Sequence, residues 1–198
     1  MKKSLSIFCA VLTAGMLTAP AYAANPYISG NCGATWFDNI NTSAGAQLIS
    51  GGINVTGAVG MAMDNFRLEA EVGNQTNIDQ VITAVFGLNG GSVSATSLLV
   101  NAYYDIKGGG VEPYLTAGVG PTWISADDWV ALPGNKRYSA KYTTLGYQFG
   151  AGVAIPLSDH FAIDARYRYF GTSTINDNTI GNFKIASSSA LVGLRYEF

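Results

Sequence analysis

The last ten residues of the chain, Ser189 to Phe198, alternate between apolar and polar positions up to the final residue. Successive side chains of a β-strand point to opposite faces. One face of this strand therefore carries Ala190, Val192, Leu194, Tyr196 and Phe198, and the other carries Ser189, Gly193, Arg195 and Glu197. A transmembrane β-barrel needs strands with one apolar face toward hydrocarbon and one polar face toward its interior. The end of the chain thus predicts a barrel strand.

The first 23 residues have the three parts of a secretory signal peptide. Lys2 and Lys3 form a basic start, residues 5–17 are apolar but too few to cross a bilayer as a helix, and Ala21-Tyr22-Ala23 is a small-x-small cleavage site. The alternative is a retained N-terminal helix, which Pro20 would end. We expect residues 1–23 to be cleaved and residues 24–198 to form a single domain.

Period-2 alternation recurs along the rest of the chain. It is clearest at residues 66–73 and 161–170, where charged residues occupy every second position and exclude a helix. Weaker alternation covers residues 27–36, 53–63, 94–106, 111–123 and 143–157. With the C-terminal strand, these segments predict an all-β, antiparallel up-and-down barrel of eight strands.

The connections alternate in length. Short turns are expected at residues 64–65, 107–110 and 158–160, and long links at residues 37–52, 75–93, 124–142 and 171–186. Outer-membrane barrels place short turns in the periplasm and long loops outside the cell. Pro113, Pro121 and Pro156 fall in predicted strands, where each should mark a strand end or a bulge.

A soluble sandwich or a lipocalin-like barrel would also alternate, with its charged face outward. The signal peptide, the terminal aromatic residue and the aromatic residues expected at the membrane rims favour the membrane barrel. These rim residues are Tyr27, Trp36, Tyr104, Trp123, Tyr167, Tyr169 and Tyr196. Removal of Lys2 and Lys3 would change the formal charge from −2 to −4, which argues against a nucleic-acid partner.

Several sequence segments resemble the porin family of small outer-membrane barrels. This family includes the OmpA transmembrane domain and the opacity-type surface proteins. The segments are residues 66–73 (FRLEAEVG), 101–105 (NAYYD), 113–120 (PYLTAGVG) and 164–169 (DARYRY). The resemblance spans the predicted mature chain except its loops. It implies a monomeric barrel in the Gram-negative outer membrane, and it implies that Tyr196 and Phe198 are the signal read by the barrel-assembly machinery.

The polar face of the predicted strands carries many charged residues. Arg67, Glu69, Glu71, Glu112, Asp164, Arg166, Arg168, Arg195 and Glu197 should point into the lumen. An eight-stranded barrel is narrow enough for side chains to fill it. We expect a network of hydrogen bonds and salt bridges that plugs the interior. The alternative is that the same charges line a narrow channel for small solutes.

Enzymatic chemistry has few candidates. The one histidine, His160, lies in a predicted short turn on the periplasmic side, and the Asp127-Asp128 pair has no base or third metal ligand beside it. We predict no catalytic residue, metal or cofactor, and a lipid A-modifying enzyme is the remote alternative. The third long link mixes charges with aromatic residues, as contact surfaces do. Its candidate contacts are Asp127, Asp128, Trp129, Lys136, Arg137 and Tyr138.

These observations predict a surface protein that either stabilises the envelope or contacts host or environmental ligands through its loops. The basic residues of the third link could instead meet the phosphates of lipopolysaccharide. The leading alternative function remains a narrow pore.

Overall fold

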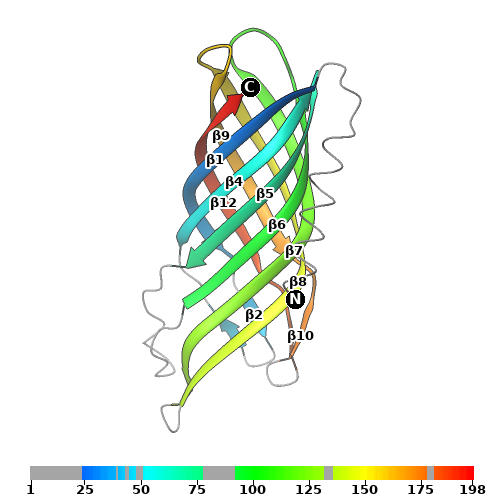
Figure 1. The fold of residues 1–198 in the computed structure, drawn as a ribbon. Helices are drawn as coiled ribbons and strands as arrows, with labels where there is room; N and C mark the ends of the chain where they lie inside the picture. The colour runs from blue at the N-terminus through cyan, green and yellow to red at the C-terminus, as the bar shows by residue number, and fades with distance from the viewer. Residues whose placement is uncertain are drawn as a thin grey trace.

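The computed structural model of the protein describes residues 24–38, 40–42, 45–47, 51–77, 92–131, 136–177 and 181–198. Within this part of the chain, eight antiparallel strands close into a barrel (Figure 1). Their order around the barrel is β1-β12-β9-β8-β7-β6-β5-β4, so β1 pairs with both β4 and β12. The predicted all-β barrel of eight strands is confirmed.

The barrel strands are longer than their alternating segments suggested. They are β1 (Ala24–Phe37), β4 (Gly52–Met63), β5 (Phe66–Asn77), β6 (Ser92–Asp105), β7 (Glu112–Ala131), β8 (Lys136–Pro156), β9 (Phe161–Thr172) and β12 (Ala186–Glu197). Four shorter strands form two hairpins outside the barrel sheet, β2 (Ile40–Thr42) with β3 (Gly45–Gln47) and β10 (Ile175–Asp177) with β11 (Gly181–Phe183). No helix in the described residues is long and apolar enough to cross a membrane.

The three predicted short turns join β4 to β5, β6 to β7 and β8 to β9. Asp64 adopts a positive φ of 46° in the first turn, and Gly109 and Gly110 adopt φ values of 70° and 108° in the second. Aspartate and glycine tolerate this backbone conformation better than most residues. In the third turn, Ser158 Oγ accepts hydrogen bonds from the backbone N–H groups of His160 and Phe161.

The outer surface of the barrel is apolar through its middle. Val192 and Leu194 are exposed on β12, and Phe66, Leu68 and Val72 are exposed on β5, as the alternation predicts. The outer surface becomes polar toward the end of the barrel where β5 finishes and β12 begins. There, Asn74 donates a hydrogen bond to Thr96, and Tyr167 donates one to Ser188. The surface thus changes from a lipid-facing band to a water-facing rim.

The prediction that residues 124–142 form the third long link is wrong, because most of this segment is paired strand. β7 continues to Ala131 and β8 begins at Lys136, and the two strands pair across this region with a bulge between Ala126 and Trp129. The β6 register with β7 ends at Ser92 and Asp127, and the β9 register with β8 begins at Thr172 and Gly146. Residues 124–131 and 136–142 therefore form the two strands of a long β-hairpin instead of parts of a loop.

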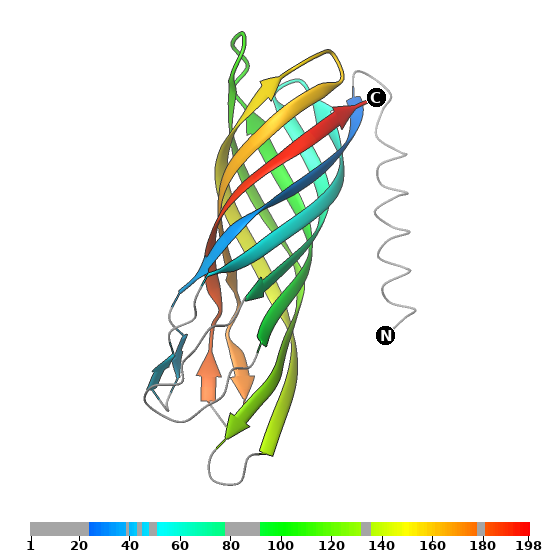
Figure 2. The same cartoon turned by 90° about the vertical axis from the view of Figure 1, so that its left-hand side faces the viewer.

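Figure 2 shows the β7–β8, β2–β3 and β10–β11 hairpins at one end of the barrel, opposite the end where β12 finishes. We call the end with the hairpins the loop end and the other the turn end.

The prolines behave as expected at Pro113 and Pro156, which lie at strand ends. Pro121 lies inside β7, and the pairing between β6 and β7 is interrupted there, between Thr122 and Val119.

Candidate functional site

The barrel interior is filled by polar side chains. Of the nine charged residues predicted for the lumen, Arg67, Glu69, Glu71, Asp164, Arg166, Arg168 and Arg195 are buried. Glu112 and Glu197 are only partly buried and lie at the turn end. The interior contains two ionic centres and a neutral network, and each of these joins strands that are not neighbours in the sheet.

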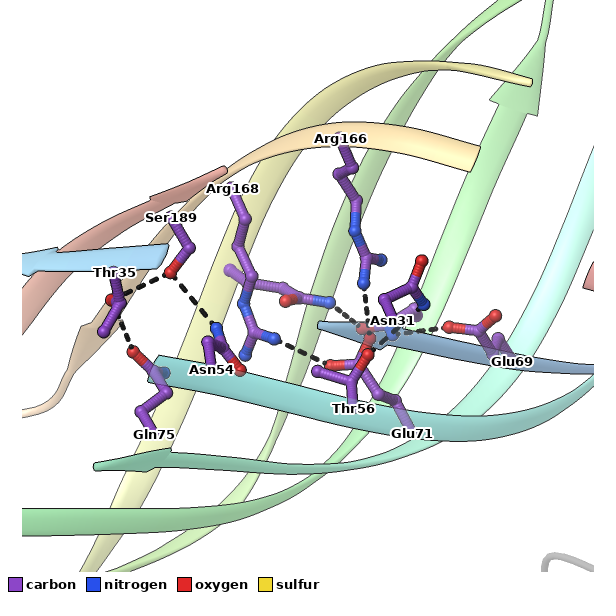
Figure 3. A network of polar contacts seen from close by, with 12 residues as sticks. Asn31, Thr35, Asn54, Thr56, Glu69, Glu71, Gln75, Arg166, Arg168 and Ser189 are labelled. Carbon is purple, nitrogen blue, oxygen red and sulfur yellow. Dashed lines mark hydrogen bonds and ion pairs between the residues drawn. The ribbon is translucent and has the colours of Figure 1, made fainter. Parts of the chain in front are cut away.

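The first centre is built around Glu71 on β5. Its two carboxylate oxygens accept hydrogen bonds from Arg166 Nη2 at 3.1 Å and Arg168 Nη1 at 3.0 Å, both on β9 (Figure 3). Because β5 and β9 are four positions apart in the ring of eight strands, these ion pairs cross the whole lumen. Nε and Nη2 of Arg168 are buried without a protein partner among the described residues. Water is the natural partner for such buried donors.

Glu69, two residues earlier on the same face of β5, collects hydrogen bonds from neutral donors. Its carboxylate accepts from Tyr27 Oη at 3.1 Å, Ser29 Oγ at 3.3 Å, Asn101 Nδ2 at 3.2 Å and Tyr103 Oη at 2.8 Å. Arg166 Nη1 donates to Tyr103 Oη at 2.6 Å and so links Glu69 to the Glu71 centre. A buried carboxylate with this many donors avoids most of the desolvation penalty of burial.

The second centre lies nearer the turn end. Arg67 Nε and Nη2 each donate to a different oxygen of Asp105 at 2.7 Å, the bidentate geometry that arginine and carboxylate favour. The Arg67 guanidinium also lies over the Tyr103 ring, 4.3 Å from its centroid, and 5.0 Å from that of Tyr114. Tyr114 in turn donates a hydrogen bond to Asp164.

Sequence reasoning missed part of this interior. The prediction that Tyr27 lies at the lipid-facing rim is wrong. Its side chain lies inside the barrel and is only 1% exposed. Asp105, Tyr103 and Tyr114 were not predicted as lumen residues. The signal was present, because Tyr103 and Asp105 share the face of β6 that carries Asn101.

Toward the loop end the interior becomes neutral. Ser189 donates to Thr35 at 2.9 Å, Asn54 donates to Ser189 at 3.1 Å, and Ser187 donates to Gln75 at 2.7 Å. Figure 3 shows this network continuing the row of contacts that starts at Glu69 and Glu71. The lumen is thus polar along its length, with its charges near the middle and at the turn end.

An apolar cluster lies at the loop end of the barrel. Its buried members are Phe37, Ala95, Ile124, Ile175, Phe183 and Ile185, and Tyr142 packs against them. Phe37 and Ile124 come from β1 and β7, on opposite sides of the ring, so the cluster spans the mouth of the barrel. Ile175, Phe183 and Ile185 belong to the link between β9 and β12 that carries the β10–β11 hairpin. We call this cluster the apolar cap.

The candidate surface contacts lie in the β7–β8 hairpin. The backbone pairs Trp129 with Tyr138, Val130 with Arg137 and Ala131 with Lys136, and Asp127 and Asp128 are also part of β7. Their side chains lie outside the described part of the structure. Beyond Trp123, β7 continues for eight residues to Ala131. At roughly 3.3 Å per residue, this extension is about 25 Å long.

His160 lies in the β8–β9 turn at the turn end, as predicted, and its ring contacts that of Tyr196 with centroids 5.9 Å apart. The described residues contain no group of three or more histidine, cysteine, aspartate or glutamate side chains placed to hold a metal ion. Tyr196 and Phe198 pack ring to ring at 5.1 Å on the outer surface.

A closed barrel with an apolar outer band and a polar, ion-paired interior defines an outer-membrane β-barrel protein. Residues 7–198 match the family model described as the outer membrane protein beta-barrel domain, and the chain belongs to this family. Its location is therefore the outer membrane of the Gram-negative cell envelope.

Known relatives and solved structures agree with this assignment. An uncharacterised protein of Brucella suis is 28% identical over 127 residues, which are 55% of this chain and 44% of that protein, so the chain spans less than half of its relative's length. The crystal structure of Neisserial surface protein A has a TM-score of 0.64 at 21% identity, covering 89% of this chain and 99% of that one.

The outer membrane protease OmpT from Escherichia coli is also similar in fold. It has a TM-score of 0.52 at 9% identity and covers 88% of this chain and 97% of that chain. The same architecture therefore occurs in a surface protein and in a protease. Fold alone does not decide between such activities, which depend on the site each barrel carries.

Proposed function

We propose that this protein is a non-enzymatic surface protein whose filled barrel is a rigid membrane scaffold and whose loop end contacts molecules outside the cell. The observation that carries the proposal is the pair of features that obstruct the lumen, the ion pairs from Arg166 and Arg168 to Glu71 and the apolar cap. Side chains that cross the lumen leave little room for solute passage.

The β7–β8 hairpin is the proposed contact surface. It extends beyond the pairing of its neighbours β6 and β9, so it would project farther from the membrane than the rest of the barrel sheet. Its tip combines Trp129 and Tyr138 with Asp127, Lys136 and Arg137, a composition typical of contact surfaces. Protein or glycan ligands and lipopolysaccharide phosphates are the proposed partners of this tip.

Replacing residues 127–138 with a two-residue Asn-Gly turn tests the proposal. Cells that display the intact protein should adhere to immobilised fibronectin, laminin, collagen or a glycan array, and cells with the shortened hairpin should lose that adhesion. Heat-modifiable gel mobility should be unchanged, because among the deleted residues only Asp127 pairs with a neighbouring strand, in the last pair between β6 and β7. Equal adhesion by both cell lines would contradict a contact role for the hairpin.

A control variant changes a charge at the loop end but outside the hairpin. Asp38→Asn alters an exposed residue at the loop end but outside the hairpin, and it should leave adhesion unchanged. If Asp38→Asn and the shortened hairpin reduced adhesion alike, the effect would not be specific to the hairpin.

A further inference from the structure

The turn end of the barrel holds an open pocket of about 330 Å³, which we call the vestibule. Its walls include Asn25 of β1, Asp64, Lys107 and Asp159 of the three short turns, and Arg195 of β12. The vestibule opens to the periplasm, because short turns lie on that side. Its volume is at the lower end of the range for small-molecule sites, so it suits a ligand of modest size.

Some charges of the vestibule already have partners. Arg67 is held by both oxygens of Asp105, and Arg195 Nε lies 3.0 Å from Glu197. Three other carboxylates, those of Asp64, Glu112 and Asp159, make no hydrogen bond or ion pair with any described residue. Lys107 is the one lysine of the described lining, and it forms no hydrogen bond or ion pair with a described residue either. The unpaired groups therefore leave an excess of negative charge.

Arg195 adds a positively charged guanidinium to the vestibule. The residue is only 6% exposed, and its guanidinium carbon lies 5.9 Å from the centroid of the Tyr27 ring. Apart from the ion pair with Glu197, its guanidinium has no partner within the described chain, and Nη1 is buried and unsatisfied. A buried guanidinium with unused donors favours a ligand that brings an acceptor, above all a carboxylate.

The Arg195 guanidinium and the Glu112 carboxylate lie on different walls of the vestibule. Arg195 is on β12 and Glu112 is at the start of β7, three positions away in the ring of eight strands. We propose that the vestibule binds a short zwitterionic peptide, with its terminal carboxylate at Arg195 and its terminal ammonium at Glu112. Asp64 and Asp159 add negative charge to the lining and outnumber the single positive charge of Lys107. This site is separate from the loop end and independent of the proposed surface function.

The test is calorimetric titration of the full-length protein, refolded in lipid nanodiscs, with L-alanyl-L-alanine. Saturable binding is expected. The N-acetylated dipeptide, which lacks the ammonium, and the C-terminal amide, which lacks the carboxylate, should each bind at least about tenfold more weakly because each loses one charge-assisted contact. Equal binding of the three peptides, or no saturable heat with any of them, would overturn the proposal.

Variants of the protein locate the site. Glu112→Gln should weaken binding of the free dipeptide about tenfold, since it removes the partner of the ammonium. Arg195→Lys should weaken it as well, and heat-modifiable mobility shows whether that variant has folded. Asp38→Asn, which makes the same charge change at the other end of the barrel, should bind normally. If Glu112→Gln bound the dipeptide as well as Asp38→Asn did, the ligand would not occupy the vestibule.

Discussion

Glu71 is fully buried and is the only carboxylate partner of both Arg166 and Arg168 within the described residues. A buried ion pair gains little over an apolar pair, because both charges lose water, but removal of one partner leaves the other charge buried and uncompensated. The fold thus depends on Glu71 more than on any half-exposed carboxylate at the turn end. This asymmetry gives the first prediction.

Glu71→Gln should lower the free energy of unfolding by about 3–5 kcal/mol, since two guanidinium groups lose their only anion. Urea titration of the protein in lipid vesicles, followed by tryptophan fluorescence, measures this change. Glu112→Gln is the matched control and should have a much smaller effect, because Glu112 has no partner in the described chain. Equal midpoints for the two variants would mean that the Glu71 centre does not stabilise the barrel.

Two glycines of β1 differ in the space around them. A Cβ atom added to Gly33 would collide with the backbone carbonyl of Ala190 on β12, whereas one added to Gly30 would have no atom nearer than the Thr56 oxygen at 4.0 Å. Gly33 therefore allows a close backbone approach that a side chain would prevent.

Gly33→Ala should destabilise the barrel by about 1–3 kcal/mol, the usual cost of overpacking, and should reduce the yield of folded protein. Gly30→Ala should leave both unchanged. The temperature at which heat-modifiable mobility is lost measures the difference. If Gly33→Ala were as stable as Gly30→Ala, the close contact between β1 and β12 would not exist in the membrane.

Most strands could be predicted from the sequence because lipid on one face and a polar lumen on the other impose strict alternation. Tyr27 was misplaced because tyrosine suits both the membrane rim and a polar interior. Its neighbours Asn25, Ser29 and Asn31 share its face, and that shared polarity was the better guide to its position. The partner of Arg166 and Arg168 could not be predicted, because their ion pairs cross the lumen from β9 to β5, which are not adjacent strands.

The β7–β8 hairpin was missed for a related reason. Beyond the lipid-facing band both faces of a strand meet water, so the alternation that marks a strand disappears, and residues 127–138 read as a charged loop. The apolar cap could not be predicted from the sequence either. Phe37, Ile124 and Phe183 come from distant segments, and only the closed barrel brings them together.

The depth of β12 in the membrane gives a prediction for this strand. Val192 is exposed in the middle of the apolar band, and Ser188 lies on the same face where the outer surface is polar and Tyr167 bonds to it. Val192→Arg should cost about 2–4 kcal/mol and Ser188→Arg about 0–1 kcal/mol, because the penalty for arginine falls from the bilayer midplane to its interface. Unfolding in urea measures both, and equal costs would show that the assigned depth is wrong.

Assembly of the whole molecule gives a further prediction, which rests on the family resemblance. Phe198 is 67% exposed and makes one backbone hydrogen bond, from its N–H to Pro26 O at 3.0 Å. Deletion of Phe198 should therefore reduce insertion into the outer membrane in cells with little loss of stability in purified, refolded protein. Phe161→Ala, which removes another exposed ring of the Tyr196 cluster, should insert normally. Normal insertion without Phe198 would contradict its role as an assembly signal.

The described structure combines an apolar cap at the loop end, a lumen crossed by ion pairs and a vestibule at the turn end. This arrangement supports the proposal that the barrel is a scaffold rather than a pathway for solutes. The most direct measurement is single-molecule conductance of the purified protein in a planar lipid bilayer at physiological salt. We predict no steady current steps at moderate voltage. Reproducible open events of uniform size would contradict the filled interior and would establish a channel in its place.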